Sequence, residues 1–187
     1  MDLALLRRIS PISAILTFAL SFRLWRLDTP KGYIFDEIYY AKNAYSLISS
    51  GVELDQQGGS EFVVHPPFGK WLIGIGIKIF GNNEFGWRSS SALFGSASVL
   101  LIYLIAKRLF KSEFLALSAA LLMAVDGLSL VMSRVALLDI FLMFFILLTF
   151  YFLSKENYWL SGMAIGLGLS TKWSAAFLIP VLLLLTI

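Results

Sequence analysis

The sequence predicts an all-α polytopic membrane protein, and three observations lead to this fold class. Hydrophobic residues make up 58% of the 187 residues, whereas charged residues make up only 14%. The apolar residues lie in long blocks, as expected of segments that cross a bilayer. Short turns rich in lysine and arginine separate some of these blocks, as they do at the cytoplasmic face of membrane proteins.

Six apolar segments are the expected spans, and together they form the N-terminal part of one transmembrane domain. The first follows Arg7 and Arg8 and lacks a small-residue cleavage site, so we expect an uncleaved signal anchor. The last is still apolar at Ile187, so we expect a C-terminal remainder and an inactive fragment without it. In chain order the spans cover residues 10–26, 89–106, 113–131, 135–153, 158–170 and 173–187.

A long mixed loop, residues 27–87, joins the first two spans. Within it, residues 41–50 are typical of a short helix and residues 51–60 of a flexible, glycine-containing turn. Residues 68–80 are apolar, but two lysines and three glycines interrupt them. This segment is too short to cross a bilayer and suits an interfacial or re-entrant element.

The later spans differ in their charges. The second has none and stops at the basic turn 107–111, and the fifth is short for a full crossing. The third contains Asp126 near its end, and the fourth contains Asp139 in its first turns. Because charge inside a bilayer is costly, both carboxylates need a partner, and Arg134 is the natural candidate for both. We expect a structural ion pair here rather than direct catalysis.

The distribution of positive charge sets the expected orientation. Short basic turns favour the cytoplasm, whereas long loops translocate largely regardless of charge. We therefore expect a multi-pass protein of the cell (plasma) membrane whose loop 27–87 faces the extracytoplasmic side. The basic residues that this alternation places on the cytoplasmic side are Arg7, Arg8, Lys107, Arg108, Lys111 and Lys155.

The composition excludes several kinds of chemistry. Without cysteine there is no disulfide framework, no thiolate nucleophile and no cysteine metal site. A single histidine rules out a histidine-rich metal cluster. No nucleotide-binding glycine loop is present, and we expect no nucleic-acid partner.

Two adjacent carboxylates, Asp36 and Glu37, stand in an aromatic stretch just after the first span. An acidic pair just outside a bilayer indicates a reaction site rather than a packing feature. On an extended segment the two side chains point in opposite directions, so they divide their roles; the alternative is two solvated loop acids. The neighbouring aromatic residues, which either stack on a substrate or form an interfacial belt, are Tyr33, Phe35, Tyr39 and Tyr40.

The sequence resembles the protein O-mannosyltransferase family over nearly the whole chain, and it is similar to the N-terminal third or more of a bacterial member. The lead into the second motif, Glu61-Phe62-Val63-Val64, is less aromatic and acidic than in eukaryotic members. The motifs that carry the resemblance are, in order, Phe35-Asp36-Glu37, His65-Pro66-Pro67-Phe68-Gly69-Lys70, Trp87-Arg88 leading into Ala92-Leu93-Phe94-Gly95, Ser133-Arg134 with Leu137-Leu138-Asp139, and Thr171-Lys172-Trp173.

The resemblance implies a GT-C transmembrane bundle whose first outer loop carries the catalytic acid. It implies inverting transfer of mannose from a polyprenyl-phosphate-mannose lipid to serine or threonine of a secreted or membrane protein. It implies no strictly required cofactor; divalent-metal dependence stays open, since only the acidic pair offers ligands. The expected partners are membrane lipid, the lipid-linked sugar and the acceptor protein.

Sugar transfer from a phosphate needs a general base near the acceptor oxygen and positive charge near the departing phosphate. Asp36 is the best candidate for the base, and Glu37 then orients a basic partner or the loop. Arg88, Arg134 and Lys172 each stand at the outer boundary of a different span, so they suit a clamp on the donor phosphate.

Snorkelling to lipid headgroups is the alternative for basic residues at these boundaries. It fits Arg23 and Arg26 best, although one of them could pair with Glu37. His65 lies in a stretch stiffened by Pro66 and Pro67 that can present its ring to the acceptor peptide or to the catalytic acid. Lys70 belongs to the same motif, and the alternative is an ordinary loop histidine.

Two other functions remain as alternatives. The first is another GT-C glycosyltransferase that moves a lipid-linked sugar to a glycan or a lipid. The second is a transporter in which Asp126, Arg134 and Asp139 form an ion path. Transporters usually show inverted repeats and unwound midplane helices, and neither is visible in this sequence.

Overall fold

The computed structural model describes residues 3–54, 58–59 and 63–186, without the side chains of residues 3–10 and 185–186. The turn expected at residues 51–60 therefore lies partly outside the described residues. Residues 61–62 of the lead into the His-Pro-Pro motif and the side chains of Arg7 and Arg8 lie wholly outside them.

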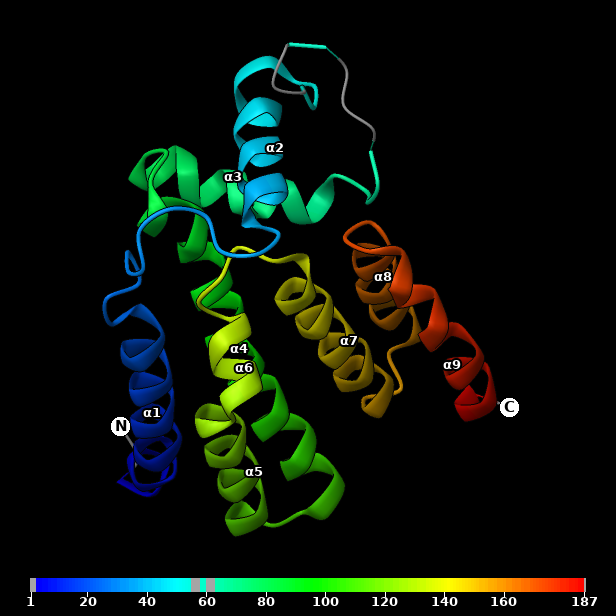
Figure 1. Ribbon diagram of the computed structural model, residues 1–187. Helices are drawn as coiled ribbons and strands as arrows, with labels where there is room; N and C mark the ends of the chain where they lie inside the picture. The colour runs from blue at the N-terminus through cyan, green and yellow to red at the C-terminus, as the bar shows by residue number, and fades with distance from the viewer. Residues whose placement is uncertain (1–2, 55–57, 60–62, 187) are drawn as a thin grey trace.

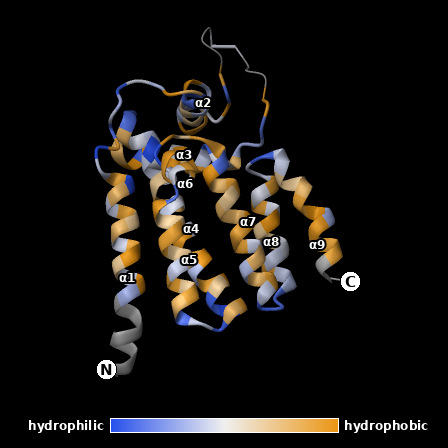
Figure 2. Cartoon of the chain, turned by 60° about the horizontal axis from the view of Figure 1, so that its bottom comes forward, coloured by the Kyte–Doolittle hydropathy of each residue, from blue (hydrophilic) through white to orange (hydrophobic). Residues whose placement is uncertain are grey.

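Helices dominate the described part of the chain, which confirms the all-α prediction (Figure 1). A short helical layer of two helices lies across one end of a bundle of longer ones, and Figure 2 shows that hydrophobic residues prevail along the bundle helices. The layer consists of α2 (Glu37–Ser50) and α3 (Phe68–Phe80). The remaining helices are α1 (Leu3–Leu24), α4 (Glu84–Phe110), α5 (Glu113–Val125), α6 (Gly127–Met132), α7 (Leu138–Ser154), α8 (Tyr158–Leu169), the 3-10 helix η1 (Trp173–Leu178) and α9 (Ile179–Thr186).

Helix α4 alone, among the described residues, is both long and apolar enough to cross a membrane by length and composition. The shorter apolar helices of 10–17 residues in the described part of the chain are Pro11–Leu24, Glu113–Val125, Leu138–Ser154, Tyr158–Leu169 and Trp173–Leu184. The six-span assignment therefore stays a prediction. Helix α3 has the bounds expected of the interfacial segment, and it runs across the ends of the bundle helices rather than along them (Figure 1).

The expected third span is divided into two helices, and Asp126 is the point of division. Its backbone is extended, with φ −60° and ψ 123°, which ends α5. Its carboxylate then accepts a hydrogen bond of 2.7 Å from the amide of Ser129 and caps the N-terminus of α6. A carboxylate at this position replaces the intrahelical acceptor that the first turn of α6 lacks.

The chain alternates between the two ends of the bundle. In Figure 1 the N-terminus, the α4–α5 turn and the α7–α8 turn lie at the end opposite α2 and α3. The basic residues of these turns therefore lie away from the layer that carries the Asp-Glu motif. The predicted topology across a membrane and the side that the layer faces stay predictions.

Two buried clusters hold the bundle together. In one, Phe94 of α4 packs edge-to-face on Phe141 and Phe144 of α7, with ring centroids 5.0 and 4.8 Å apart. The other cluster joins α1, α4 and α5. Its small residues, among them the fully buried Ala19 and Ala120, allow these three helices to pack closely. The cluster of Phe94 fixes the start of α7, which stands directly beneath the layer.

Candidate functional site

Glu37 and Arg88 form a fully buried ion pair beneath the α1–α2 loop. Both side chains are 0% exposed, and the guanidinium meets the carboxylate in a two-pronged contact. Arg88 Nε donates to Glu37 Oε1 and Nη2 donates to Oε2, each at 2.8 Å. Parallel bonds of this kind are the strongest and most directional that an arginine makes.

The remaining donors of Arg88 hold the loop in place. Nη1 donates to the carbonyls of Leu27 and Pro30, and Nη2 donates to that of Gly32. All five N–H groups of this guanidinium are therefore used inside the protein. The phosphate-binding role predicted for Arg88 is wrong on this geometry, because the loop folds over the side chain and leaves it no donor for a ligand.

Glu37 is equally occupied. Its two oxygens also accept hydrogen bonds of 2.8 Å from the amides of Ile34 and Ala136. The loop after α1, the start of α2 and the connection before α7 are thus fixed to one carboxylate. The expected role of Glu37, orienting a basic partner or the loop, agrees with these contacts, and its partner is Arg88 rather than Arg23 or Arg26.

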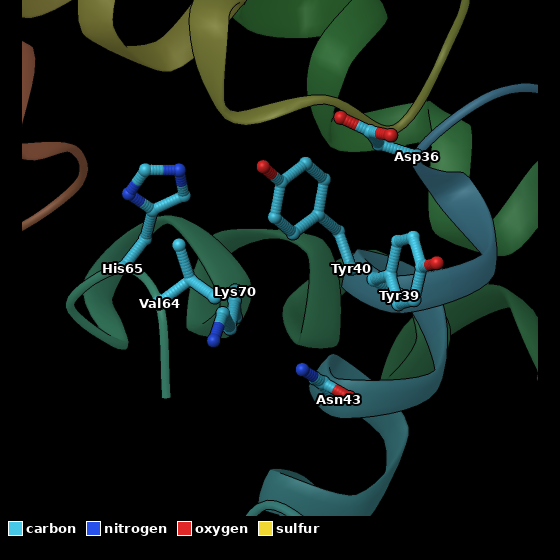
Figure 3. A pocket seen from close by; sticks show the side chains of 7 residues that line it. All are labelled: Asp36, Tyr39, Tyr40, Asn43, Val64, His65 and Lys70. Atoms are coloured by element: carbon cyan, nitrogen blue, oxygen red, sulfur yellow. The ribbon is translucent and has the colours of Figure 1, made fainter. Parts of the chain in front are cut away.

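Asp36 has the opposite environment from its neighbour. It precedes α2 directly, but its side chain makes no capping hydrogen bond. It is half-buried and lines a cavity of about 360 Å³. Figure 3 shows Asp36 and Tyr40 on the α2 side of this cavity and His65 on the other. The full lining is Asp36, Tyr39, Tyr40, Asn43, Val64, His65 and Lys70.

The His-Pro-Pro motif forms the second wall of the cavity. Helix α3 starts right after Pro67, and its first amide, that of Phe68, donates to the carbonyl of Ser170 at 3.1 Å. The indole Nε1 of Trp173 donates to the carbonyl of Val64 at 3.1 Å. Two motifs that are more than 100 residues apart in the sequence are thereby joined at the cavity.

Gly69 explains the glycine of the same motif. A Cβ at this position would lie 2.8 Å from Leu138 Cδ2 and 2.8 Å from Thr171 Cγ2. Only a residue without a side chain allows the first turn of α3 to pack so closely against α7 and the α8–η1 turn.

Tyr40 and His65 are both held in their neutral forms. Burial raises the pKa of Tyr40 to about 12, and the nearby charges of Asp36 and Asp139 act in the same direction. Burial lowers the pKa of His65, and Lys172 and Lys70 add to this effect against the two carboxylates. The rings lie 6.3 Å apart between centroids, and His65 Nδ1 is buried without a hydrogen-bond partner.

The expected pairing of Asp126 and Asp139 with Arg134 is wrong. Asp139 pairs instead with Lys172, at 2.7 Å, because the start of α7 and the α8–η1 turn meet at the same end of the bundle. Asp126 caps α6, as described above. Arg134 donates to the carbonyls of Phe22 and Arg23, at 2.8 and 3.0 Å, and to that of Arg26 at 3.3 Å. It therefore satisfies free carbonyls at the end of α1.

Arg23 does not snorkel, contrary to the alternative favoured for it. Its side chain is 0% exposed and donates to Ser133 Oγ at 3.0 Å and Ser129 Oγ at 3.2 Å. It also reaches the carbonyls of Ala19 and Ala124, at 3.2 and 3.5 Å. Ala124 and Ser129 flank the break between α5 and α6 and Ser133 follows α6, so this region supplies acceptors that draw the guanidinium inward instead of toward the bilayer surface.

Glu53 and Asn43 are functional candidates that sequence reasoning missed. Glu53 forms an ion pair with Lys70, and both side chains are buried, with 4% and 2% exposure. Asn43 Nδ2 donates to the same carboxylate at 3.0 Å. Lys70, in the apolar segment 68–80, needs a counter-charge, but no sequence pattern indicates that Glu53 supplies it.

No group of three or more potential metal ligands occurs within the part of the chain that the structure describes. The cavity offers the carboxylate of Asp36 and two neutral rings, and the Lys172–Asp139 pair acts electrostatically on one of them, His65. Such a set can accept a proton from a hydroxyl and present positive charge to an anion.

Comparison with known proteins gives a consistent set of relatives. The family described as dolichyl-phosphate-mannose-protein mannosyltransferase matches residues 13–187. A polyprenol-phosphate-mannose–protein mannosyltransferase of Mycobacterium tuberculosis is 36% identical over 177 residues, covering 78% of this chain and 34% of that protein. An undecaprenyl phosphate-alpha-4-amino-4-deoxy-L-arabinose arabinosyl transferase of Pseudomonas paraeruginosa is 34% identical over 165 residues, covering 82% of this chain and 30% of that protein.

A solved structure shares the fold. The S. cerevisiae protein O-mannosyltransferase Pmt1-Pmt2 complex bound to the sugar donor matches with a TM-score of 0.82 and 25% identity. The match covers 96% of this chain and 28% of that one, and it confirms the expected GT-C fold. The chain spans about a third of the length of the curated relatives it matches.

Proposed function

The chain belongs to the dolichyl-phosphate-mannose-protein mannosyltransferase family, and we propose that the full-length protein transfers mannose from a polyprenyl-phosphate-mannose lipid to Ser or Thr hydroxyls of proteins. One observation carries the assignment of the base. Of two adjacent carboxylates, Glu37 is buried and neutralised by Arg88, whereas Asp36 faces the cavity without a capping bond. Asp36 is therefore the carboxylate that can accept a proton.

In the proposed reaction, Asp36 takes the proton of the acceptor hydroxyl as its oxygen attacks the anomeric carbon. The bond between that carbon and the phosphate oxygen breaks, and polyprenyl phosphate leaves with the bonding electrons. Configuration at the carbon inverts because attack and departure are in line. Neutral Tyr40 and His65 can hydrogen-bond the acceptor without adding charge beside the base.

Lys172 is the proposed contact for the departing phosphate. It is 22% exposed, its partner Asp139 is 45% exposed, and both act electrostatically on His65. An ammonium that is already oriented by a carboxylate can meet a developing anion with little rearrangement. Arg134 keeps donors beyond those that it uses on the carbonyls of Phe22, Arg23 and Arg26, so it is the second candidate.

We place this site at the extracytoplasmic face of a multi-pass membrane protein with the six spans predicted from the sequence. Support comes from the basic α4–α5 turn and from the α7–α8 turn with Lys155, which lie at the end of the bundle opposite α2 (Figure 1), the helix that Asp36 directly precedes.

Transfer from synthetic polyprenyl-phosphate mannose to a Ser/Thr peptide tests the proposal, in membranes containing the full-length protein. Asp36→Asn is expected to lose at least about 100-fold in transfer, the lower range for a general base. Asp28→Asn is the matched control, because Asp28 lies in the same loop, is exposed and pairs only with the exposed Lys31. Activity that survives Asp36→Asn would move the base elsewhere.

A second function is favoured by one observation, the similarity to the arabinosyl transferase. In that case the donor is another undecaprenyl-phosphate-linked sugar and the acceptor is not a peptide. Offering the same membranes undecaprenyl-phosphate aminoarabinose distinguishes the two. Turnover of that donor, with none of the mannosyl lipid, would replace the first proposal.

A further inference from the structure

We propose that the buried Glu53–Lys70 ion pair is a positioning element, which fixes the separation of the two cavity walls and thereby the place of the acceptor peptide. This inference rests on the proposed function for its substrate. The structural claim, that the ion pair sets the distance between the walls formed by α2 and the start of α3, does not depend on the substrate. Glu53 touches neither the cavity nor any of the reacting groups described above, so its action on the site is indirect.

The pair is deeply buried. Lys70 Nζ contacts Glu53 Oε2, with side-chain exposures of 2% and 4%. Asn43 Nδ2 donates to the same oxygen at 3.0 Å. Two charges removed from water to this extent are stable only as a pair, because either one alone keeps its full desolvation cost.

The three residues come from three segments that meet beside the cavity. Asn43 lies on α2, the helix that carries Tyr39 and Tyr40 and begins next to Asp36. Lys70 lies on the first turn of α3, directly after the His-Pro-Pro wall. Glu53 follows the end of α2 and connects back to both. In Figure 3 the amide nitrogen of Asn43 points toward Lys70 from the opposite wall.

The two helices are in close contact further along the same interface. A Cβ on Gly74 of α3 would lie 2.6 Å from Ile48 Cγ2 and 3.4 Å from the carbonyl oxygen of Ala44. The helices are therefore pressed together at Gly74, and the ion pair closes the end of the interface that faces the cavity. If the charge of Glu53 is removed, the ammonium of Lys70 gains by moving toward water, and Lys70 already lines the cavity.

Steady-state kinetics of the full-length protein test the inference through Glu53→Gln, Lys70→Met and the double variant. Each single variant is expected to raise the acceptor KM about 10-fold or more, with the donor KM unchanged, because a displacement of about 1 Å can cost 100-fold. The double variant removes both charges but keeps an acceptor for Asn43, so most of the loss is expected to disappear.

Lys107→Met and Glu113→Gln are the matched controls. This pair is also lysine–glutamate, but it lies at the α4–α5 turn, at the opposite end of the bundle, with exposures of 41% and 38%. Both variants are expected to leave the acceptor KM unchanged. Equal rises of donor and acceptor KM in the Glu53 and Lys70 variants, or a double variant as impaired as the singles, would overturn the inference.

A measurement without any sugar transfer separates the inference from the proposed function. Spin labels at Tyr39→Cys and Val64→Cys, which lie on opposite cavity walls, report the distance between the walls. Glu53→Gln is expected to broaden or lengthen the distance distribution, and adding Lys70→Met is expected to restore it. An unchanged distribution in Glu53→Gln overturns the inference even if mannose transfer is confirmed, whereas a broadened one supports it even if that transfer fails.

Discussion

Adjacent carboxylates are predicted to respond in opposite ways to the same chemical change. Glu37→Gln and Asp36→Asn each replace one charged oxygen by an amide. Glu37 accepts four hydrogen bonds of 2.8 Å, two from Arg88 and one each from the amides of Ile34 and Ala136. Asp36 has no capping hydrogen bond and is half-buried. The first change is expected to lower stability, and the second to lower activity alone.

The magnitude for Glu37→Gln follows from the contacts of both oxygens. Whichever way the new amide turns, its NH₂ faces two donors, one of them on Arg88. The guanidinium, 0% exposed, is left without a counter-charge. Breaking a buried ion pair in this way costs about 3–5 kcal/mol. Asp36→Asn buries no lone charge, so its effect is expected within about 0.5 kcal/mol.

Thermal unfolding of the purified full-length protein in detergent, beside mannose transfer from the same preparations, separates the two effects. Glu37→Gln is expected to unfold at a clearly lower temperature, since about 3–5 kcal/mol is a large fraction of a typical folding free energy. Asp36→Asn is expected to unfold with the parent. Equal unfolding temperatures for the parent and Glu37→Gln would refute the assignment of a structural role to the pair.

Three further predictions concern the layer above the bundle. The pKa of His65 is lowered from 6.5, so its contribution to stability is present above that pH and is lost on acidification. The unfolding temperature of the parent is therefore expected to fall between about pH 7 and pH 5, and that of His65→Gln is expected to fall less. Because the pKa of Tyr40 is raised from 10 to about 12, its contribution is present below pH 10 and lost through pH 12, and Tyr40→Phe is expected to reduce alkaline unfolding monitored by circular dichroism. Gly76→Ala would place a Cβ against the carbonyl oxygen of Gly86 and is expected to cost about 1–3 kcal/mol in thermal unfolding. Gly162→Ala, which meets nothing within 4 Å, is its control, and equal stabilities would contradict the predicted clash.

Hydropathy predicted the helical segments well because apolar length is a local property. Different environments for Asp36 and Glu37 were predicted from an extended segment, whereas Asp36 has φ −74° and ψ 0° and directly precedes α2. The roles assigned to the two carboxylates stay proposals. The helix break at Asp126 was only partly predictable, because a carboxylate in an apolar run indicates that a partner is needed without showing which one. Here the partner is the N-terminus of the new helix α6.

The partners of the charged residues were not predictable, because they depend on which ends of the bundle meet. Arg88 stands at the edge of a span, where snorkelling or phosphate binding is the natural inference, yet the loop after α1 covers it. Asp139 finds Lys172, 33 residues away, rather than the nearer Arg134. Glu53 finds Lys70 because α2 and α3 pack together. Each of these pairs is a property of tertiary contact.

The contacts of Glu37 also impose an order on biogenesis. Its carboxylate is completed by the amide of Ala136, 99 residues further along the chain. At a synthesis rate of about 5–20 residues per second, roughly 5–20 s pass between the emergence of the two partners. Arg88, which holds the loop bearing Asp36, lies 51 residues after Glu37 and emerges about half-way through that interval, so the loop is at first held by neither partner. The contacts of Glu37 are therefore complete only after α6, the helix before Ala136, has been synthesised and has packed into the bundle. Until then the loop that bears Asp36 is most exposed to misfolding and to proteases.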